Sequence, residues 1–275
     1  MKSRFTRRLM PLLLPFGAWA LLLVAGCDDA GPPPQGSGEG PGHRAQQLGV
    51  SPEQEFELGQ QAYRHVLREN RDRVLPAEDR QVRRVRAIVG KIVRAAGMKP
   101  LQREINLHLQ GYRFEWEANV IEDRQINAFC LPGGKIIVYT GILRVAKDDD
   151  QLATVLGHEI AHALAHHSNE RITRDQSGQV SGLAAKAYDR AQESEADHIG
   201  LFLMTFAGYD PDEAVRFWER MRRTHQGANR PPEFLSDHPS DERRIEDMQK
   251  WAPKAKAAKR QFDAGHIAPA PDGSE

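Results

Sequence analysis

The periodicity of hydrophobic residues changes along the chain and predicts helices at both ends with strands between them. Over residues 82–93, apolar side chains recur every three or four positions, which is the spacing of one buried helix face. The pattern predicts helices over residues 52–70 and 76–96. Ser51 before a proline is a typical helix start, and Gly97 ends the second helix.

The middle of the chain has an alternating pattern instead. Apolar residues alternate over residues 105–109 and 114–118, as they do in half-buried strands. Two further apolar segments, 126–131 and 136–139, flank Pro132-Gly133-Gly134, which is a turn signal. These two segments are predicted to form a β-hairpin, and the expected sheet is small and antiparallel.

The helical pattern returns after Gly141 and continues to the end of the domain. It predicts helices over residues 151–167, 193–207, 210–224 and 239–259. No internal repeat is present, which excludes a solenoid. The expected fold class is α+β: mostly helical, with a small antiparallel sheet beside the helix at 151–167.

The N-terminal residues have the composition of an export signal. Basic residues between positions 2 and 8 precede an apolar stretch, 9–24, that is shorter than the roughly 20 residues a membrane-spanning helix needs. The stretch ends in Val24-Ala25-Gly26-Cys27, which resembles the lipobox of bacterial lipoproteins. This resemblance implies that Cys27 is lipidated. The alternative is an ordinary signal peptide in which Cys27 is incidental.

Composition divides the chain into four parts. We expect a lipoprotein-type signal peptide at 1–26, a disordered Gly/Pro-rich tether at 27–50, one folded domain at 51–262 and a disordered tail at 263–275. This organisation predicts a protein of the bacterial cell envelope, held at the membrane by a lipid anchor and facing the periplasm. Whether the membrane is the inner or the outer one stays open.

Charge and cysteine content exclude two classes of protein. The 38 Lys and Arg residues balance the 38 Asp and Glu residues, and this lack of a basic surplus speaks against a nucleic-acid partner. The two cysteines, Cys27 and Cys130, are too few for a disulfide scaffold. Stability must therefore come from packing.

His158-Glu159-Ile160-Ala161-His162 is the segment that points to chemistry. Residues four apart on a helix lie on the same face, so His158 and His162 can bind one Zn²⁺. Glu159 then lies where it reaches a metal-bound water and acts as its base. The alternative is that the histidines form a solvated helix face, which is the expectation for His166 and His167.

A catalytic zinc site needs a third protein ligand, and Glu193, Glu195 and Asp197 offer carboxylates. His-Glu-x-x-His followed by Glu193-x-x-Ala196-Asp197 resembles the M48 family of gluzincin metallopeptidases, in particular its periplasmic lipoprotein branch. The resemblance covers about residues 51–250. It implies one zinc ion per chain, with Glu193 as the third ligand and Asp197 as an acceptor that orients a histidine ligand. Glu195 points away from Glu193 as a surface carboxylate and is the fallback ligand.

Two other segments also resemble the family. Residues 127–134 are similar to a hairpin whose edge strand implies main-chain pairing with an extended substrate; Cys130 replaces the usual alanine there and is interpreted as a small buried residue. His238-Pro239 and Arg244-Ile245 resemble the family's C-terminal motif. His238 then stabilises the oxyanion, blocks the open metal position, or merely starts a helix. Arg244 stabilises charge, pairs with a carboxylate such as Asp197, or lies on the surface.

The resemblance implies a zinc-dependent endopeptidase that acts on unfolded or misassembled envelope proteins in protein quality control. One alternative is a chaperone-like or assembly-factor lipoprotein that keeps zinc for structure; a closed shell of protein ligands favours it. Another is a metal hydrolase of a non-peptide bond. The segment between His162 and Glu193 is shorter than in many relatives, which leaves the wall of the substrate groove open.

Overall fold

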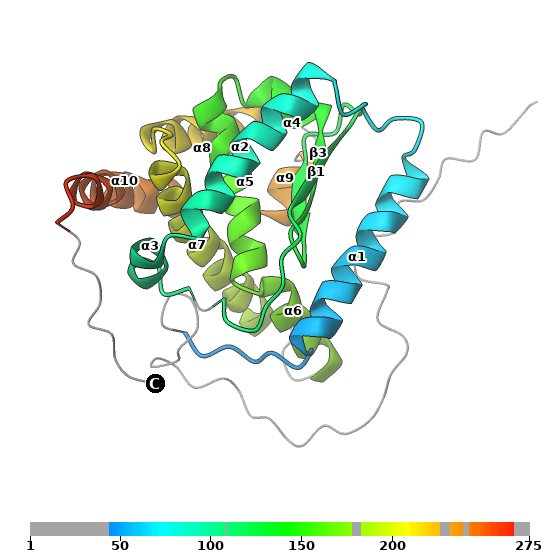
Figure 1. Ribbon diagram of the computed structural model, residues 1–275, viewed down its shortest axis with the longest axis horizontal. Helices are drawn as coiled ribbons and strands as arrows, with labels where there is room; N and C mark the ends of the chain where they lie inside the picture. Colours follow the sequence, from blue (N-terminus) through cyan, green and yellow to red (C-terminus); the bar gives the residue numbers. More distant parts are fainter. Residues whose placement is uncertain (1–43, 108, 178–182, 226–231, 239–241, 267–275) are drawn as a thin grey trace, which may run out of the picture.

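The computed structural model describes residues 44–107, 109–177, 183–225, 232–238 and 242–266, in which helices surround a small sheet (Figure 1). The mostly helical α+β fold predicted from the sequence is confirmed. In chain order the elements are α1 (Pro52–Glu69), α2 (Arg80–Ala96), α3 (Lys99–Glu104), β1 (Glu117–Ile121), β2 (Ala128–Leu131), β3 (Lys135–Tyr139), α4 (Thr140–Val145), α5 (Asp149–Leu164), α6 (His167–Ser177), α7 (Leu183–Phe206), α8 (Asp212–His225), α9 (Glu233–Asp237) and α10 (Glu242–Asp263).

The sheet has the strand order β1-β3-β2 and is mixed. Strands β2 and β3 form the predicted antiparallel hairpin, and its turn requires Gly133 and Gly134, whose φ angles are 74° and 85°. Strand β1 runs parallel to β3, although the sequence predicted a wholly antiparallel sheet. The chain reverses direction between β1 and β2 but leaves the central position for β3, and this placement is set by tertiary packing.

Both faces of the sheet are covered (Figure 1). On one face, Ile136 and Val138 join the main core with α2 and α5, whereas Ile137 packs with Tyr63 of α1 and Ile121 on the other. A strand buried on two sides needs apolar residues at successive positions. This is why Lys135–Tyr139 is a continuous apolar run after its first residue.

Several element boundaries differ from the sequence predictions. The expected strand at 105–109 is absent from the described part of that stretch, which follows the short helix α3. The strand expected at 114–118 begins later, at Glu117, and the helix expected at 239–259 is preceded by the separate short helix α9. In each case a short apolar pattern fitted more than one kind of element.

Helix α5, which carries His158 and His162, is shorter than predicted. It ends at Leu164, and His166 has a positive φ of 54°, so that α6 starts in a new direction at His167. The His166 ring is held in this conformation by Glu55, whose Oε1 lies 3.0 Å from Nδ1, and by stacking on Tyr112. Tertiary contacts therefore stabilise a turn that neither glycine nor proline marks.

Residues 44–50, which fall within the predicted tether, make defined contacts with the domain. Residues 44–50 lie against α6 and α7, through contacts that include Arg44 with Glu195 and Val50 with Asn169. The predicted signal peptide and Cys27 lie outside the described residues. Within the described part of the chain, no helix is both long enough and apolar enough to cross a membrane.

Helix α5 occupies the centre of the domain and packs against α7 at a pair of glycines. A Cβ atom at Gly157 would lie 2.8 Å from the backbone oxygen of Gly200, and one at Gly200 would lie 2.7 Å from the backbone nitrogen of His158. The two backbones are therefore in direct contact. This close approach brings the carboxylates of α7 to the histidines of α5.

Gly200→Ala is expected to lower the free energy of unfolding by about 1–3 kcal/mol, because the added methyl group must push α7 away from α5. Gly90→Ala on α2 is the matched control, since its Cβ would meet only the flexible end of Arg94 at 3.5 Å. That change should stabilise the protein by about 0.4–1 kcal/mol. Urea unfolding measures both, and equal effects would contradict the close-contact explanation.

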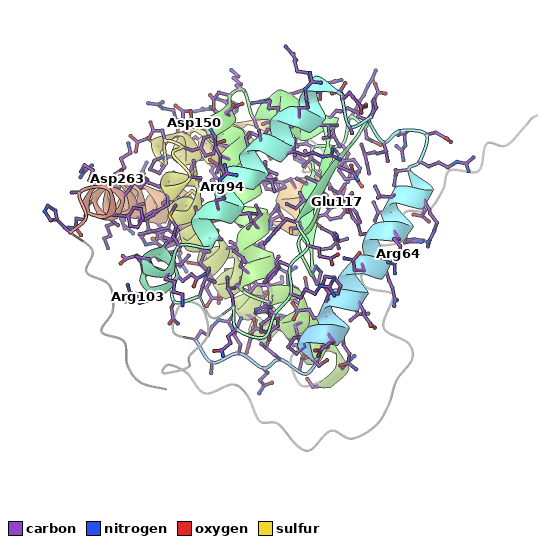
Figure 2. The ribbon with its side chains drawn as sticks, viewed as in Figure 1. Arg64, Arg94, Arg103, Glu117, Asp150 and Asp263 are labelled. Atoms are coloured by element: carbon purple, nitrogen blue, oxygen red, sulfur yellow. The ribbon has the colours of Figure 1, made fainter. Side chains whose placement is uncertain are left out.

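Charged side chains lie mostly on the outside of the domain. Figure 2 shows Arg64, Arg94 and Arg103 projecting from α1, α2 and α3, with Glu117 on the edge strand. Against this background, several buried charged residues are conspicuous around α5 and α7. They are Glu159, Glu170, Glu193, Asp197 and Arg244.

Candidate metal centre

Four buried side chains converge at the middle of the domain. His158 and His162 come from α5, Glu193 comes from α7, and His238 follows the last residue of α9. Each offers one ligand atom, and these atoms all lie within 4.8 Å of one another. Helical spacing brings the two α5 histidines together, and the α5–α7 contact adds the carboxylate.

Most of the separations between these groups are close to those in a tetrahedral metal site. His158 Nε2 lies 3.1 Å from His162 Nε2 and 3.1 Å from His238 Nδ1. The Glu193 carboxylate lies 3.3 Å from His158, 3.4 Å from His162 and 3.0 Å from His238. Ligands about 2.0–2.1 Å from a central ion would be roughly 3.3 Å apart at the corners of a tetrahedron.

The outer ring nitrogens of the two α5 histidines face other groups. His158 Nδ1 lies 2.9 Å from Asp197 Oδ1, and His162 Nδ1 lies 2.7 Å from His167 Nδ1. Protons on these outer nitrogens leave lone pairs on both Nε2 atoms, which face each other and the Glu193 carboxylate. Such a group of buried acceptors requires a cation, so the residues fit a bound metal ion.

Burial and mutual contact also set the charges of these groups. Burial lowers the pKa of His162 well below its ordinary value, so this imidazole is neutral. Burial alone would raise the pKa of Glu193, but the neighbouring His238 holds it well below its ordinary value. Neutral imidazole and ionised carboxylate are the forms that bind a metal.

Glu159 lies beside this cluster without belonging to it. Its side chain is buried, and Oε1 lies 3.3 Å from Nε2 of His238. Burial raises the pKa of Glu159 to about 7. A carboxylate with this pKa next to a metal position is suited to accept and return a proton at neutral pH.

Cys130 of strand β2 lies near the Glu159 carboxylate. Burial, and then the charge of Glu159, raise the pKa of the Cys130 thiol well above its ordinary value. The thiol is therefore protonated and has little reactivity. This agrees with the interpretation of Cys130 as a small buried residue.

Arg244 of α10 contacts several residues that surround the ligand cluster. Its Nε and Nη2 each donate to one oxygen of Asp197 at 2.6 Å, and its guanidinium carbon lies 3.7 Å from the centre of the Trp218 ring. A third nitrogen, Nη1, donates to the backbone oxygen of His238 at 3.2 Å. Of the alternatives for Arg244, the geometry favours pairing with Asp197 over a surface position.

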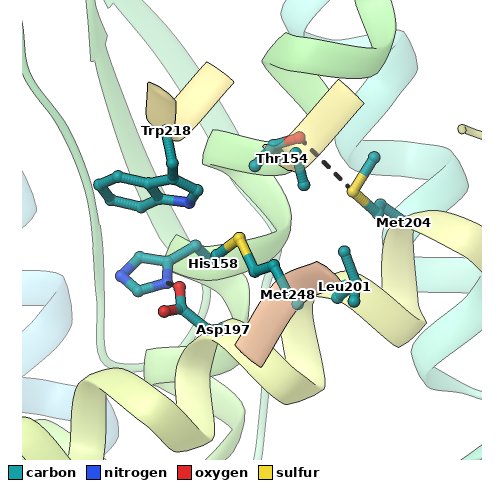
Figure 3. Close-up of a pocket in the computed structure, with 9 residues that line it drawn as sticks. Thr154, His158, Asp197, Leu201, Met204, Trp218 and Met248 are labelled. Carbon is teal, nitrogen blue, oxygen red and sulfur yellow. Dashed lines mark hydrogen bonds and ion pairs between the residues drawn. The ribbon is translucent and has the colours of Figure 1, made fainter. Parts of the chain in front are cut away.

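A small cavity lies behind His158 (Figure 3). Asp197 and Trp218 flank the imidazole, while Thr154, Met204, Leu201 and Met248 line the far side. Apart from His158 and Asp197 its lining is largely apolar, and the hydroxyl of Thr154 donates to the sulfur of Met204 at 3.5 Å. The histidine therefore has polar partners at its ring nitrogens and apolar side chains beside its ring.

The structure places three residues near the site differently from the sequence predictions. His166 and His167 are buried instead of lying on a solvated face. Glu195 is half-buried, and its Oε2 lies 3.0 Å from Nε2 of His167. Because Glu195 contacts His167 rather than the ligand atoms, it is not part of the metal cluster, in contrast to its proposed fallback role.

The arrangement is the one expected of a metallopeptidase: a buried helix carries two histidines, a second helix adds the carboxylate of Glu193, and the carboxylate of Glu159 lies beside the group. Comparison with known sequences agrees. The model of peptidase family M48 matches residues 81–185 and 178–252, and the chain belongs to this family.

Relatives with known names support the same class. The chain is 36% identical over 237 residues to the mitochondrial metalloendopeptidase OMA1 of Schizosaccharomyces pombe, covering 79% of this chain and 66% of the relative. It is 36% identical over 249 residues to the OMA1 of Saccharomyces cerevisiae, covering 82% and 71%. It is also 27% identical over 176 residues to the beta-barrel assembly-enhancing protease of Escherichia coli, covering 53% and 36%.

These comparisons assign the chain to the metalloendopeptidases, as predicted. The chain spans about two thirds of the length of the fission-yeast relative. They contradict the predicted location in a bacterial cell envelope, because the relatives that match about four fifths of the chain are mitochondrial. The prediction of an envelope location rested on residues 1–27. The matched domain, in contrast, occurs in both mitochondrial and bacterial proteins.

Proposed function

We propose that the chain is a zinc-dependent endopeptidase in which His158, His162 and Glu193 hold the metal and Glu159 is the general base. The observation that carries the proposal is the tetrahedral spacing of the ligand atoms, with the Glu159 carboxylate beside them. Histidine nitrogen and carboxylate oxygen are ligands that zinc prefers in catalytic sites. Asp197 would orient His158, and Arg244 would hold Asp197 in place.

The protein residues would divide the reaction between them. A bound Zn²⁺ supplies a water of lowered pKa and polarises the scissile carbonyl. Glu159 would take the proton of that water and pass it to the leaving amine. Strand β2 is an edge strand of the sheet, and an extended peptide can pair with it through main-chain hydrogen bonds.

The proposed substrates are unfolded or misassembled proteins, in a quality-control role. Main-chain pairing with an edge strand favours extended segments with little regard to sequence. The name of the E. coli relative, a beta-barrel assembly-enhancing protease, supports a connection with protein assembly. Casein, which lacks a stable fold, is therefore a suitable test substrate.

Chelation provides the first test of the proposed function. The full chain is expected to contain one zinc ion and to cleave casein, to lose cleavage with 1,10-phenanthroline, and to regain it when zinc is added. Metal content and casein fragments are measured on the same sample. A protein that holds no zinc after purification with zinc present would contradict the proposal.

One observation favours a second function, that of a zinc-containing assembly factor without proteolysis. His238 lies where a fourth ligand would, and its second nitrogen contacts Glu159. It would thus complete a closed shell of protein ligands and also engage the base. If the protein is a peptidase, the same contacts mean that His238 occupies the open metal position and must move away before a substrate can bind.

His238→Ala distinguishes the two functions. If His238 blocks the site, the variant should cleave casein faster than the wild type, with zinc bound somewhat more weakly because one ligand is lost. If the zinc is structural, the variant should lose zinc or stability and gain no cleavage. Unchanged zinc affinity and unchanged cleavage would show that His238 only supports the fold.

A further inference from the structure

The outer nitrogen of His162 faces a second buried histidine. Nδ1 of His162 lies 2.7 Å from Nδ1 of His167, and both rings are buried. Two ring nitrogens at this distance share a single proton, so one donates and the other accepts. Since Nε2 of His162 faces the ligand cluster and keeps its lone pair, the proton is on Nδ1 of His162 and His167 accepts it.

The same reasoning continues through His167 to Glu195. With Nδ1 of His167 accepting, its proton is on Nε2, which lies 3.0 Å from Oε2 of Glu195 and donates to it. Glu195 in turn accepts two parallel hydrogen bonds from Arg44: Nε donates to Oε1 and Nη2 to Oε2, each at 2.9 Å. His162 thus donates to His167, His167 donates to Glu195, and Arg44 donates to Glu195 from the other end, so that each donor in the row has an acceptor.

Arg44 is fixed by a second carboxylate. Its Nη1 and Nη2 also donate to Glu170 of α6, whose side chain is 2% exposed. Gln192 of α7 donates to the same carboxylate at 2.8 Å. One guanidinium thus forms ion pairs with two carboxylates on neighbouring helices. Without it, the two negative charges would repel each other.

The backbone that carries Arg44 is fastened to the α5–α6 junction. Gln46 donates to the backbone oxygen of Ala165 at 2.7 Å, and the backbone nitrogen of Gly49 donates to Thr173 at 2.7 Å. Val50 exchanges two hydrogen bonds with the side chain of Asn169. Residues 44–50, which we call the N-terminal clasp, therefore hold Arg44 in a defined place.

We propose that Arg44, Glu195 and His167 are positioning residues that hold His162 in the tautomer and orientation of a metal ligand. The inference rests on the proposed function, in which His162 binds zinc. Carboxylate groups that accept from a ligand histidine commonly affect metal affinity by about 10–100-fold. Here a second histidine, His167, lies between the ligand histidine and the carboxylate. Arg44 of the N-terminal clasp binds that carboxylate, Glu195, although the two residues are 151 positions apart in sequence.

The test compares zinc affinity among variants of the full chain, by competition with a chromophoric chelator. His167→Leu and Glu195→Gln are expected to weaken zinc binding by about 10–100-fold. Arg44→Ala is also expected to weaken zinc binding. His167→Asn should recover most of the affinity, because its amide oxygen can accept from His162. The absorption spectrum of the Co²⁺-loaded protein should shift in His167→Leu and return toward that of the wild type in His167→Asn.

Arg174→Ala is the matched control for Arg44→Ala. Arg174 also pairs with a carboxylate, Asp189, and also lies over the Tyr188 ring. Within the described residues, its ion pairs do not include His162, His167 or Glu195. Melting temperatures of the metal-free proteins separate folding defects from weaker binding. The inference is overturned if folded His167→Leu and Glu195→Gln bind zinc within about twofold of the wild type. A wild-type chain that binds no zinc overturns the proposed function itself, and the inference with it.

Discussion

Glu159→Gln is expected to reduce casein cleavage by about 10²–10⁴-fold while leaving zinc bound. A glutamine has nearly the same shape but cannot take a proton from a water, and general base catalysis contributes about 10²–10⁴-fold to such reactions. The carboxylate is buried and is not one of the clustered ligand groups. Metal content should therefore match that of the wild type.

Glu219→Gln on α8 is a suitable control for this change, because its carboxylate is partly exposed and pairs only weakly with Arg223 at 3.9 Å. It should cleave casein like the wild type. Cleavage by Glu159→Gln within about tenfold of the wild type, with zinc bound, would rule out Glu159 as the base. Loss of zinc in Glu159→Gln would instead show that Glu159 contributes to metal binding.

Arg244→Met is expected to lower the free energy of unfolding by about 3–5 kcal/mol, because it leaves the buried carboxylate of Asp197 without its ionic partner. Burial alone would raise the pKa of Asp197, but Arg244, followed by His158, holds it below its ordinary value. The side chain of Asp197 is 1% exposed, so water cannot replace the lost partner. For a domain of this size, the melting temperature should fall by about 10 °C.

The double variant Arg244→Met with Asp197→Asn separates this role from a catalytic one. Neutralising Asp197 removes the unpaired charge, so part of the lost stability should return. If Arg244 acted only on the charge of the reaction, the single variant would melt like the wild type and only cleavage would fall. Calorimetry and a casein assay on the same proteins distinguish these outcomes.

The clustered residues of the site could be predicted from the sequence, but the residues that contact them from outside the cluster could not. Helical spacing alone places His158 and His162 on one face, and the carboxylate of Glu193 was expected through a family pattern. His167 could not be placed in this way. On a continuous helix, a residue five positions after His162 points away from it, and only the left-handed turn at His166 brings the two rings together.

Long-range packing explains the other differences. The hairpin of β2 and β3 has a local turn signal, whereas the parallel pairing of β1 with β3 depends on strand order, which no local pattern encodes. Residues 44–50 have the composition of a linker. Their order depends on Arg44 meeting carboxylates 126 and 151 positions away, and such pairs are not visible in a single sequence.

The proposed ligands lie far apart along the chain, which gives the metal a thermodynamic role beyond chemistry. His158 and Glu193 lie on the separate helices α5 and α7, and His238, which reaches the same position as a block or a fourth ligand, is 80 positions from His158 and 45 from Glu193. An ion bound to all of them closes loops of these lengths and restricts the unfolded chain much as a covalent bridge would. Chelation should therefore loosen the C-terminal helices as well as stop cleavage, so that metal-free protein becomes a better substrate for other proteases. Within a cell, the supply of metal would then govern how long this chain survives.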